Sequence, residues 1–112
     1  MGAYSQGILS NNFIFTAGEG AIDPKTNQWV GGDIKQQTRI AMENVKAILE
    51  ESGSSLDKVV KVTIFIKDKA LFGAMNEVYT SYFPRDPPAR STAVTDLLRD
   101  DMLIEIEAVA AI

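Results

Sequence analysis

The spacing of hydrophobic residues along the chain predicts a β-hairpin followed by a long loop. Residues 5–9 and 13–17 have the composition of short strands, and Asn11-Asn12 between them suits a two-residue turn, because Asn tolerates positive φ. Residues 18–32 contain Gly residues, an Asp-Pro pair and an Asn that interrupt any regular pattern. We expect a loop there, with Trp29 as the large apolar residue that pins it.

Two helices are predicted further along the chain. Asp33 followed by Gln36 has the spacing of a helix N-cap with a reciprocal partner, and apolar residues then recur at helical spacing up to Gly53. A second helix is expected from about Lys69 to Tyr82, and Pro84 and two further prolines end it. Its apolar stripe consists of Leu71, Phe72, Met75, Val78, Tyr79 and Tyr82.

Three more segments have the character of strands. Residues 59–66 carry apolar groups on both faces, as a central strand does, and residues 91–95 and 102–110 follow the second helix. In the last strand Met102, Ile104, Ile106 and Ala108 point one way, and Leu103, Glu105, Glu107 and Val109 point the other. The second of these faces is mixed in character.

The predicted order is ββαβαββ, which indicates an α+β fold. Two helices are enough to cover one face of the sheet. The other face carries Phe13, Phe15 and part of the 59–66 strand, and an apolar face of this kind needs a partner. We expect that partner to be another copy of the chain.

Composition narrows the function classes. The 112 residues, 46% of them hydrophobic, fit one domain over residues 1–112. The net charge of -4 and the lack of a basic run make nucleic acid an unlikely partner. The chain has no His and no Cys, so it lacks the usual neutral-pH base, thiolate nucleophiles and the commonest zinc ligands. No stretch is long enough to span a membrane, and we expect a cytoplasmic protein, or an organellar one if an upstream targeting segment was removed.

The candidate residues must come from Arg, Glu, Asp, Tyr, Asn, Ser and Thr. Arg90 closes an Asp-Pro-Pro-Ala-Arg run that holds it at a strand start, where a guanidinium can bind a carboxylate in bidentate fashion, although a solvated Arg has the same pattern. Glu105 is either a partly buried acid with a tuned pKa that orients a water, or a member of an edge-strand salt bridge. Tyr4 and Asn76 are weaker candidates, because such residues commonly serve packing and loop bonding.

Eight fragments, in order along essentially the whole chain, resemble the Rid family, also called YjgF, the reactive intermediate deaminases or the L-PSP endoribonucleases. They are Gly2–Gly7, Thr16–Gly18, Asp23–Thr26, Gln37–Val45, Val59–Phe65, Asn76–Tyr79, Pro88–Ser91 and Ile104–Glu107. The resemblance implies a chorismate-mutase-like subunit that assembles as a homotrimer with three clefts between subunits. Members of the RidA deaminase branch hydrolyse 2-iminobutanoate and 2-iminopropanoate to 2-oxo acids and ammonia, without metal or cofactor.

The resemblance also implies roles for individual residues. Arg90 matches the Arg that binds the substrate carboxylate, and Glu105 matches the acid that positions the attacking water. Tyr4 and Asn76 match residues that contact or support the substrate. An imine is already electrophilic, so fixing its carboxylate and orienting a water supply much of the rate without a strong base.

The chain departs from the family pattern at several positions in this site. Ala17, before Gly18, stands where many members have Ser, and Thr92 stands where many have Cys. Glu19 replaces a common Gln, and Ala3 and Arg99 each replace a Pro. Three functions therefore stay open: an imine deaminase, a non-catalytic trimer that binds small carboxylates or a partner protein, and an endoribonuclease.

Overall fold

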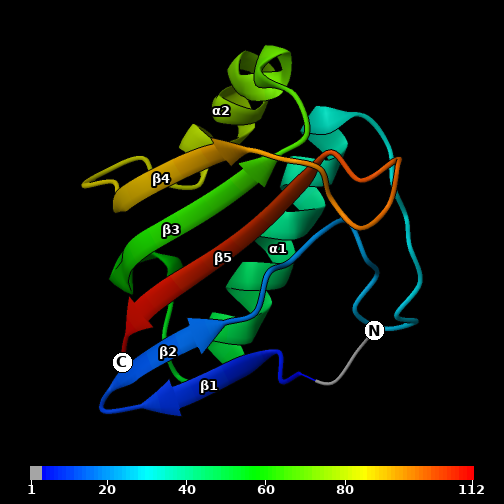
Figure 1. Ribbon diagram of the computed structural model, residues 1–112. Helices are drawn as coiled ribbons and strands as arrows, with labels where there is room; N and C mark the ends of the chain where they lie inside the picture. Colours follow the sequence, from blue (N-terminus) through cyan, green and yellow to red (C-terminus); the bar gives the residue numbers. More distant parts are fainter. Residues whose placement is uncertain (1–3) are drawn as a thin grey trace.

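The computed structural model describes residues 4–112, so the first part of the Gly2–Gly7 fragment, including Ala3, lies outside the described residues. The chain forms a five-stranded sheet with two helices on one face (Figure 1). The strands are β1 (Gly7–Ser10), β2 (Phe13–Thr16), β3 (Val59–Ile66), β4 (Ala89–Val94) and β5 (Ile104–Ala111). The helices are α1 (Ile34–Glu51) and α2 (Phe72–Ser81).

The order of the strands in the sheet is β1-β2-β5-β3-β4. β1 and β2 form the predicted hairpin, and both residues of the Asn11-Asn12 turn have positive φ. β5 pairs antiparallel with β2 and β3, whereas β3 and β4 are parallel and α2 connects them. The predicted ββαβαββ order and the α+β class are confirmed, and β5 occupies the centre of the sheet.

The helices begin and end for local reasons. The Asp33 side chain accepts a hydrogen bond from the Gln36 backbone N–H at 2.8 Å, which is the predicted N-cap of α1. Short 3₁₀ turns at Leu56–Lys58 and Lys69–Leu71 precede β3 and α2. The second turn accounts for the earlier start expected for α2, because the Asp68 side chain caps it by accepting from the Ala70 N–H.

The hydrophobic core lies between the sheet and the two helices. Alternate residues of β3 and β5 point into it, and they meet the apolar stripes of α1 and α2. Its fully buried members include Ile14, Met42, Leu49, Ile64, Met75, Ile104 and Ile106. The core therefore forms on the single sheet face that the helices cover.

The other sheet face is open to solvent in the single chain. Phe13 and Phe15 are 39% and 46% exposed, and Val60 of β3 is 47% exposed. Phe13, Phe15 and part of the 59–66 strand are the residues that the sequence placed on the uncovered face. No helix among residues 4–112 is long and apolar enough to cross a membrane.

Candidate functional site

The first group of candidate residues gathers at the start of β4. Arg90 Nη1 donates a hydrogen bond to Asn76 Oδ1 of α2 over 2.6 Å. The Arg90 guanidinium also lies 4.8 Å from the centre of the Tyr79 ring and 5.4 Å from that of Phe72. Arg90 is thus half-buried and held on three sides, unlike the solvated Arg that the sequence left open.

This first group borders a cleft of about 390 Å³ beside α2. Its lining consists of Asn76, Tyr79, Thr80, Phe83, Pro87, Pro88 and Arg90. Thr92 follows Arg90 by two residues in β4, so its side chain points to the same sheet face. Its register partner in β3 is Ile64. We call Arg90, Asn76, Tyr79 and Phe72 the arginine wall.

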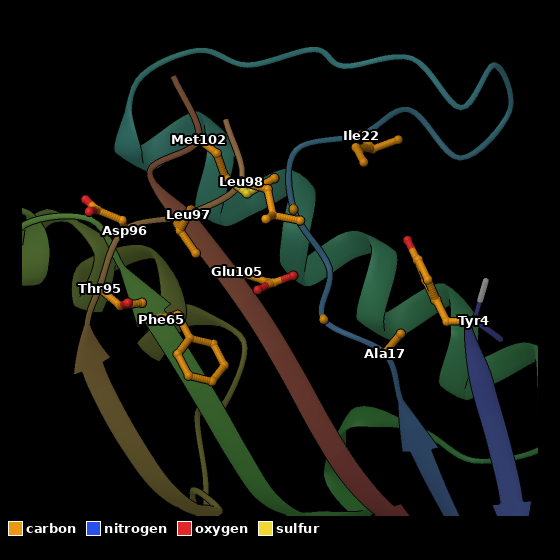
Figure 2. A pocket seen from close by; sticks show the side chains of 12 residues that line it. Tyr4, Ala17, Ile22, Phe65, Thr95, Asp96, Leu97, Leu98, Met102 and Glu105 are labelled. Atoms are coloured by element: carbon orange, nitrogen blue, oxygen red, sulfur yellow. The ribbon is translucent and has the colours of Figure 1, made fainter. Parts of the chain in front are cut away.

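The second group gathers around Glu105 in the centre of the sheet. A cleft of about 480 Å³ opens above it, and Tyr4, Ala17 and Gly18 border that cleft (Figure 2). Glu105 lies in β5 between β2 and β3, so the edge-strand salt bridge considered from the sequence is wrong. Glu105, Tyr4, Ala17 and Gly18 form what we call the glutamate wall.

Gly18 allows the chain to pass directly over Glu105. A Cβ at this position would lie 2.6 Å from the Cδ and Oε1 atoms of Glu105. Only a residue without a side chain fits this approach with Glu105 in place. Burial, followed by the nearby charge of Glu107, raises the pKa of Glu105, so its carboxyl takes up a proton more readily than an exposed Glu does.

Glu19 is a buried acid beside the glutamate wall, whereas Glu105 itself is half-buried. Its backbone pairs with that of Ile106, and its residue is only 9% exposed. Burial, and then the charge of Glu105, raise the pKa of Glu19 to about 7. The sequence marked Glu19 only as a departure from the family's Gln, and the burial of a single Glu in a Gly-rich loop leaves no pattern in the sequence.

The two walls lie on opposite faces of the sheet within one chain. Arg90 is paired with Val62 and Glu105 is paired with Phe65, both in β3. Directly paired residues point to the same face, and Val62 and Phe65 point to opposite faces, because side chains alternate along a strand. The fold therefore brings Arg90 to Asn76, and Glu105 to Tyr4, Ala17 and Gly18, without bringing the two walls together.

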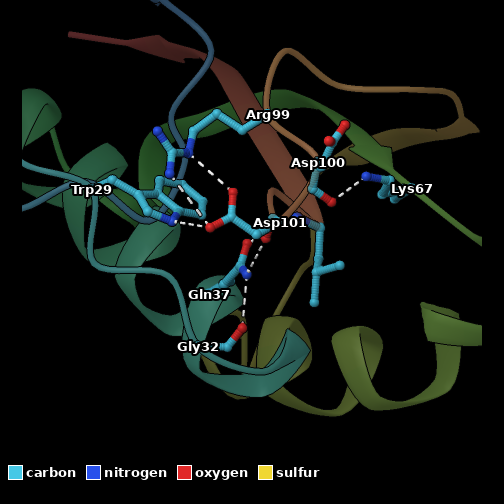
Figure 3. A network of polar contacts seen from close by, with 8 residues as sticks. Trp29, Gly32, Gln37, Lys67, Arg99, Asp100 and Asp101 are labelled. Atoms are coloured by element: carbon cyan, nitrogen blue, oxygen red, sulfur yellow. Dashed lines mark hydrogen bonds and ion pairs between the residues drawn. The ribbon is translucent and has the colours of Figure 1, made fainter.

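A polar network holds the two loops that border the larger cleft (Figure 3). Trp29 Nε1 donates to the Asp101 carboxylate at 2.8 Å, and the Arg99 guanidinium lies 4.7 Å from the Trp29 ring centre. The buried Gln37 amide donates to the carbonyls of Gly32 and Asp101 and accepts from the Leu103 N–H. Trp29 thus pins its loop as expected, through a partner 72 residues away.

Sequence reasoning missed two residues of the arginine wall and the apolar lining of the larger cleft. Tyr79 and Phe72 were assigned to the apolar stripe of the second helix, although Tyr79 lies three residues after Asn76 and so shares its helix face. The apolar side of the larger cleft comes from separate segments, and no local pattern connects them. Its members are Ile22, Phe65, Leu97, Leu98 and Met102.

Comparison with known proteins places the chain in a family. The profile of the family described as Endoribonuclease L-PSP matches residues 1–112. A RutC family protein of Pyrococcus abyssi is 54% identical over 98% of this chain and 87% of its own length. The chloroplastic Reactive Intermediate Deaminase A of Arabidopsis thaliana is 39% identical over 100% of this chain and 60% of its own length.

Solved structures agree with this assignment. The crystal structure of E. coli TdcF with bound serine matches with a TM-score of 0.91 and 36% identity, over 100% of this chain and 90% of that one. The chain belongs to the Endoribonuclease L-PSP family, which is the Rid or YjgF family that the sequence resembles. Membership supports a deaminase or small-molecule-binding role at the family level.

Proposed function

We propose that the chain hydrolyses small 2-imino acids, such as 2-iminobutanoate and 2-iminopropanoate, to 2-oxo acids and ammonia in clefts between the subunits of a homotrimer. The observation that carries the proposal is the separation of the two walls. A carboxylate-binding Arg90 and a water-orienting Glu105 can face one small molecule only if they come from different chains. The exposed sheet face with Phe13 and Phe15 supports such an assembly.

The arginine wall suits the carboxylate of the substrate. Asn76 and the two aromatic rings fix the Arg90 guanidinium before the ligand arrives, so less side-chain freedom is lost on binding. E. coli TdcF, whose structure contains bound serine, shows that a relative binds a small molecule with a carboxylate.

The glutamate wall suits the chemical step. Glu105 accepts a proton from a water as the water oxygen bonds to the imine carbon, and it then returns that proton to the nitrogen. The product of this step is a carbinolamine. Its hydroxyl proton then passes through Glu105 to the nitrogen, the carbon–nitrogen bond breaks, ammonia leaves, and the carbon keeps the oxygen as a carbonyl. Because its pKa is raised, the Glu105 carboxylate is a stronger base than that of an exposed Glu, so it takes the proton from the water more readily.

A coupled assay tests the activity. A threonine dehydratase generates 2-iminobutanoate, and the release of 2-oxobutanoate is followed with and without the protein. We expect Arg90→Ala to remove the acceleration, and the matched control Arg85→Ala, at an exposed Arg outside both walls, to retain it. An Arg90→Ala variant as fast as the unaltered chain would refute the proposal.

Mixed trimers test whether the site is shared between chains. Arg90→Ala and Glu105→Gln subunits, each of which we expect to be inactive alone, are co-expressed so that they assemble together. If each cleft takes one wall from each of two chains, about a quarter of the clefts in a random mixture carry two intact walls. Recovery of activity near that level is expected, and a mixture that assembles as trimers without regaining activity contradicts a shared site.

The second candidate is a trimer that binds small carboxylates without catalysis. Ala17 favours this candidate. Many members of the family that the sequence resembles carry a Ser at this position of the glutamate wall, and Ala17 lacks the hydroxyl with which that Ser could touch the substrate. This candidate predicts that 2-oxobutanoate binds, measured by calorimetry, while imine hydrolysis proceeds at the rate of buffer alone. An endoribonuclease activity has less support, given the net charge of -4. A salt-titrated RNA-binding measurement tests it directly.

A further inference from the structure

Residues 18–20 separate the cleft above Glu105 from a second pocket on the helix side of the sheet. A Cβ at Gly18 would meet Glu105, so residue 18 faces the cleft. Glu19 pairs with Ile106, whose side chain is fully buried in the core between the sheet and the helices. Directly paired residues point to the same face, so the Glu19 side chain points toward the helices and away from the cleft.

This second pocket, which we call the helix-side pocket, lies between the loop after β2 and α1, and its volume is about 250 Å³. The residues that α1 contributes to its lining are Asn44, Ala47, Ile48 and Glu51. Glu19 borders this pocket and does not border the cleft above Glu105. The open sheet face with Phe13 and Phe15 is the face that the helices do not cover. A second chain on that face therefore leaves the helix-side pocket accessible.

Glu19 brings a carboxyl group without a partner to this pocket. The residue is 9% exposed, and among residues 4–112 no ion pair or side-chain hydrogen bond satisfies its carboxyl. A buried acid in this situation has lost hydration without gaining a bond, which costs free energy whether it is ionised or protonated. Buried polar groups in native structures rarely stay unsatisfied. The burial of Glu19 therefore indicates a ligand that supplies hydrogen-bond donors.

The other polar groups of the pocket fit a ligand with a positive charge. Its charged residues, Glu19 and Glu51, are both acidic. Asn44 Nδ2 donates to the carbonyls of Gly20 and Ile22, at 3.2 and 2.8 Å, and so ties the loop to α1. The Asn44 amide oxygen accepts no hydrogen bond among the described residues, so it is available to a ligand. Two carboxylates and this oxygen match the three N–H donors of a primary ammonium group.

The walls between these acceptors are apolar. They consist of Ile22, Pro24, Ala47 and Ile48. Such walls suit the short hydrocarbon stem of an organic amine, just as the stem of a Lys side chain packs on apolar surface beside its charged end. The volume lies below the range typical of sites for drug-sized ligands, which limits the ligand to a few carbons.

We propose that the helix-side pocket binds a small organic cation with a primary ammonium group, such as an alkylamine of a few carbons. The nitrogen lies at Glu19 and Asn44, and the stem lies along Ile48. This site is separate from the arginine and glutamate walls, so it does not depend on the proposed deaminase activity. Many members of the family that the sequence resembles have Gln at this position, so the site is specific to chains that carry this Glu.

Propylammonium is the probe, and an NMR titration of the assembled protein measures its binding. We expect a Kd of about 1 mM or tighter, with the largest shifts at the backbone amides of residues 18–22 and at the side-chain amide of Asn44. Tetramethylammonium carries the charge without N–H donors, and propan-1-ol carries the stem without the charge. Both should bind at least about tenfold more weakly. The proposal is wrong if propylammonium does not approach saturation by about 10 mM, or if tetramethylammonium or potassium binds equally well.

Glu19→Gln tests the carboxylate in the assembled protein. Gln keeps the shape of the side chain and is common at this position in the family, so we expect the variant to fold. Its affinity for propylammonium should fall at least about tenfold, because a charge-assisted hydrogen bond is lost. Glu50→Gln, at an exposed position of α1 outside the pocket, is the matched control, and Arg90→Ala in the arginine wall is a second. Both should bind as the unaltered chain does. Unchanged affinity in Glu19→Gln, or a loss in Arg90→Ala, contradicts binding at this pocket.

The pH dependence identifies the group that binds the cation. Burial, and then the charge of Glu105 in β5, raise the pKa of Glu19 to about 7, and the other titratable groups at the pocket are Tyr4 and Glu51 of α1. An alkylamine keeps its proton up to about pH 10, so between about pH 5.5 and 8 the affinity follows the ionisation of Glu19. We expect the affinity to rise at least about tenfold over this range in the unaltered chain and to stay constant in Glu19→Gln. A flat profile in the unaltered chain would show that the Glu19 carboxylate does not hold the ammonium group.

Discussion

Arg90 and Asn76 are joined by a hydrogen bond of 2.6 Å from the guanidinium Nη1 to the side-chain amide oxygen. The bond connects the start of β4 to the middle of α2, two elements that follow one another in the parallel β3-α2-β4 unit. The amide oxygen is an acceptor that offsets the loss of water around a half-buried guanidinium without neutralising its charge. Arg90 therefore keeps its charge available for a ligand.

The first prediction concerns this acceptor. We expect Asn76→Ala to raise KM for the imine about tenfold with a smaller change in kcat, because a hydrogen bond to a charged group contributes about 1.5 kcal/mol or more. Asn76→Asp should reduce activity further, since a carboxylate beside Arg90 competes with the substrate for the guanidinium. Steady-state kinetics with Glu77→Ala as the control measure both effects. A KM unchanged in both variants contradicts the role given to Asn76.

The second prediction separates the ring of Tyr79 from its hydroxyl. The ring packs against the Arg90 guanidinium, whereas the buried hydroxyl has no hydrogen-bond partner among the described residues. We expect Tyr79→Phe to keep ligand affinity and to leave stability equal or raise it by about 1 kcal/mol, because an unsatisfied hydroxyl is removed.

Tyr79→Leu removes the aromatic face and is the contrasting variant. We expect it to weaken binding of 2-oxobutanoate by about fivefold, in line with the ~1 kcal/mol of a partly buried cation–π contact. Calorimetric titration gives the affinity, and denaturant unfolding gives the stability. Equal affinities for the Phe and Leu variants would show that the ring does not position Arg90.

The fold was largely predictable from the sequence because its elements are patterned locally. The alternation in β5 that separates Ile104 and Ile106 from Glu105 and Glu107 is visible in the sequence, and the structure buries the first pair. The Asp33 cap and the Asn11-Asn12 turn are local signals of the same kind. Element ends shifted by a few residues, since 3₁₀ turns and frayed strand ends depend on tertiary contacts.

The site was predictable only in part. Arg90 and Glu105 could be selected because a proline run and a mixed strand face mark them, together with the family resemblance. Their placement on opposite sheet faces depends on the parallel pairing of β3 with β4, which the linear pattern does not specify. The burial of Glu19 depends on its pairing with Ile106, and so it could not be read from the neighbouring residues.

The third prediction concerns the space above Glu105. Gly18→Ala places a Cβ 2.6 Å from the carboxyl group, so either the Glu105 side chain or the segment above it must move. Small displacements of a catalytic group have large effects on rate. We expect kcat to fall at least about tenfold while the protein remains folded and assembled.

A glycine in open space provides the matched control for this change. Gly73→Ala introduces the same methyl group at a position in α2 where a new Cβ meets no atom within 4 Å. Its activity should equal that of the unaltered chain, and its stability should rise slightly because Ala favours the helix. Full activity in Gly18→Ala would mean that the close approach to Glu105 is not required for the reaction.

The fourth prediction follows from the raised pKa of Glu19. The pKa of Glu19 is about 7 in the folded chain, against 4.5 for an ordinary Glu. Between pH 4.5 and pH 7 the folded state therefore binds more protons than the unfolded state. The stability that this group contributes is therefore complete below about pH 4.5 and is lost as the pH rises through 7.

Glu19→Gln keeps the shape of the protonated carboxyl and does not ionise. Relative to the unaltered chain, its free energy of unfolding should increase from pH 4.5 to 8, by at most about 3 kcal/mol. Denaturant unfolding at several pH values measures the difference between the two proteins, with Glu50→Gln at an exposed helix position as the control. A difference that stays constant across this range would show that Glu19 is already ionised at low pH in the folded protein.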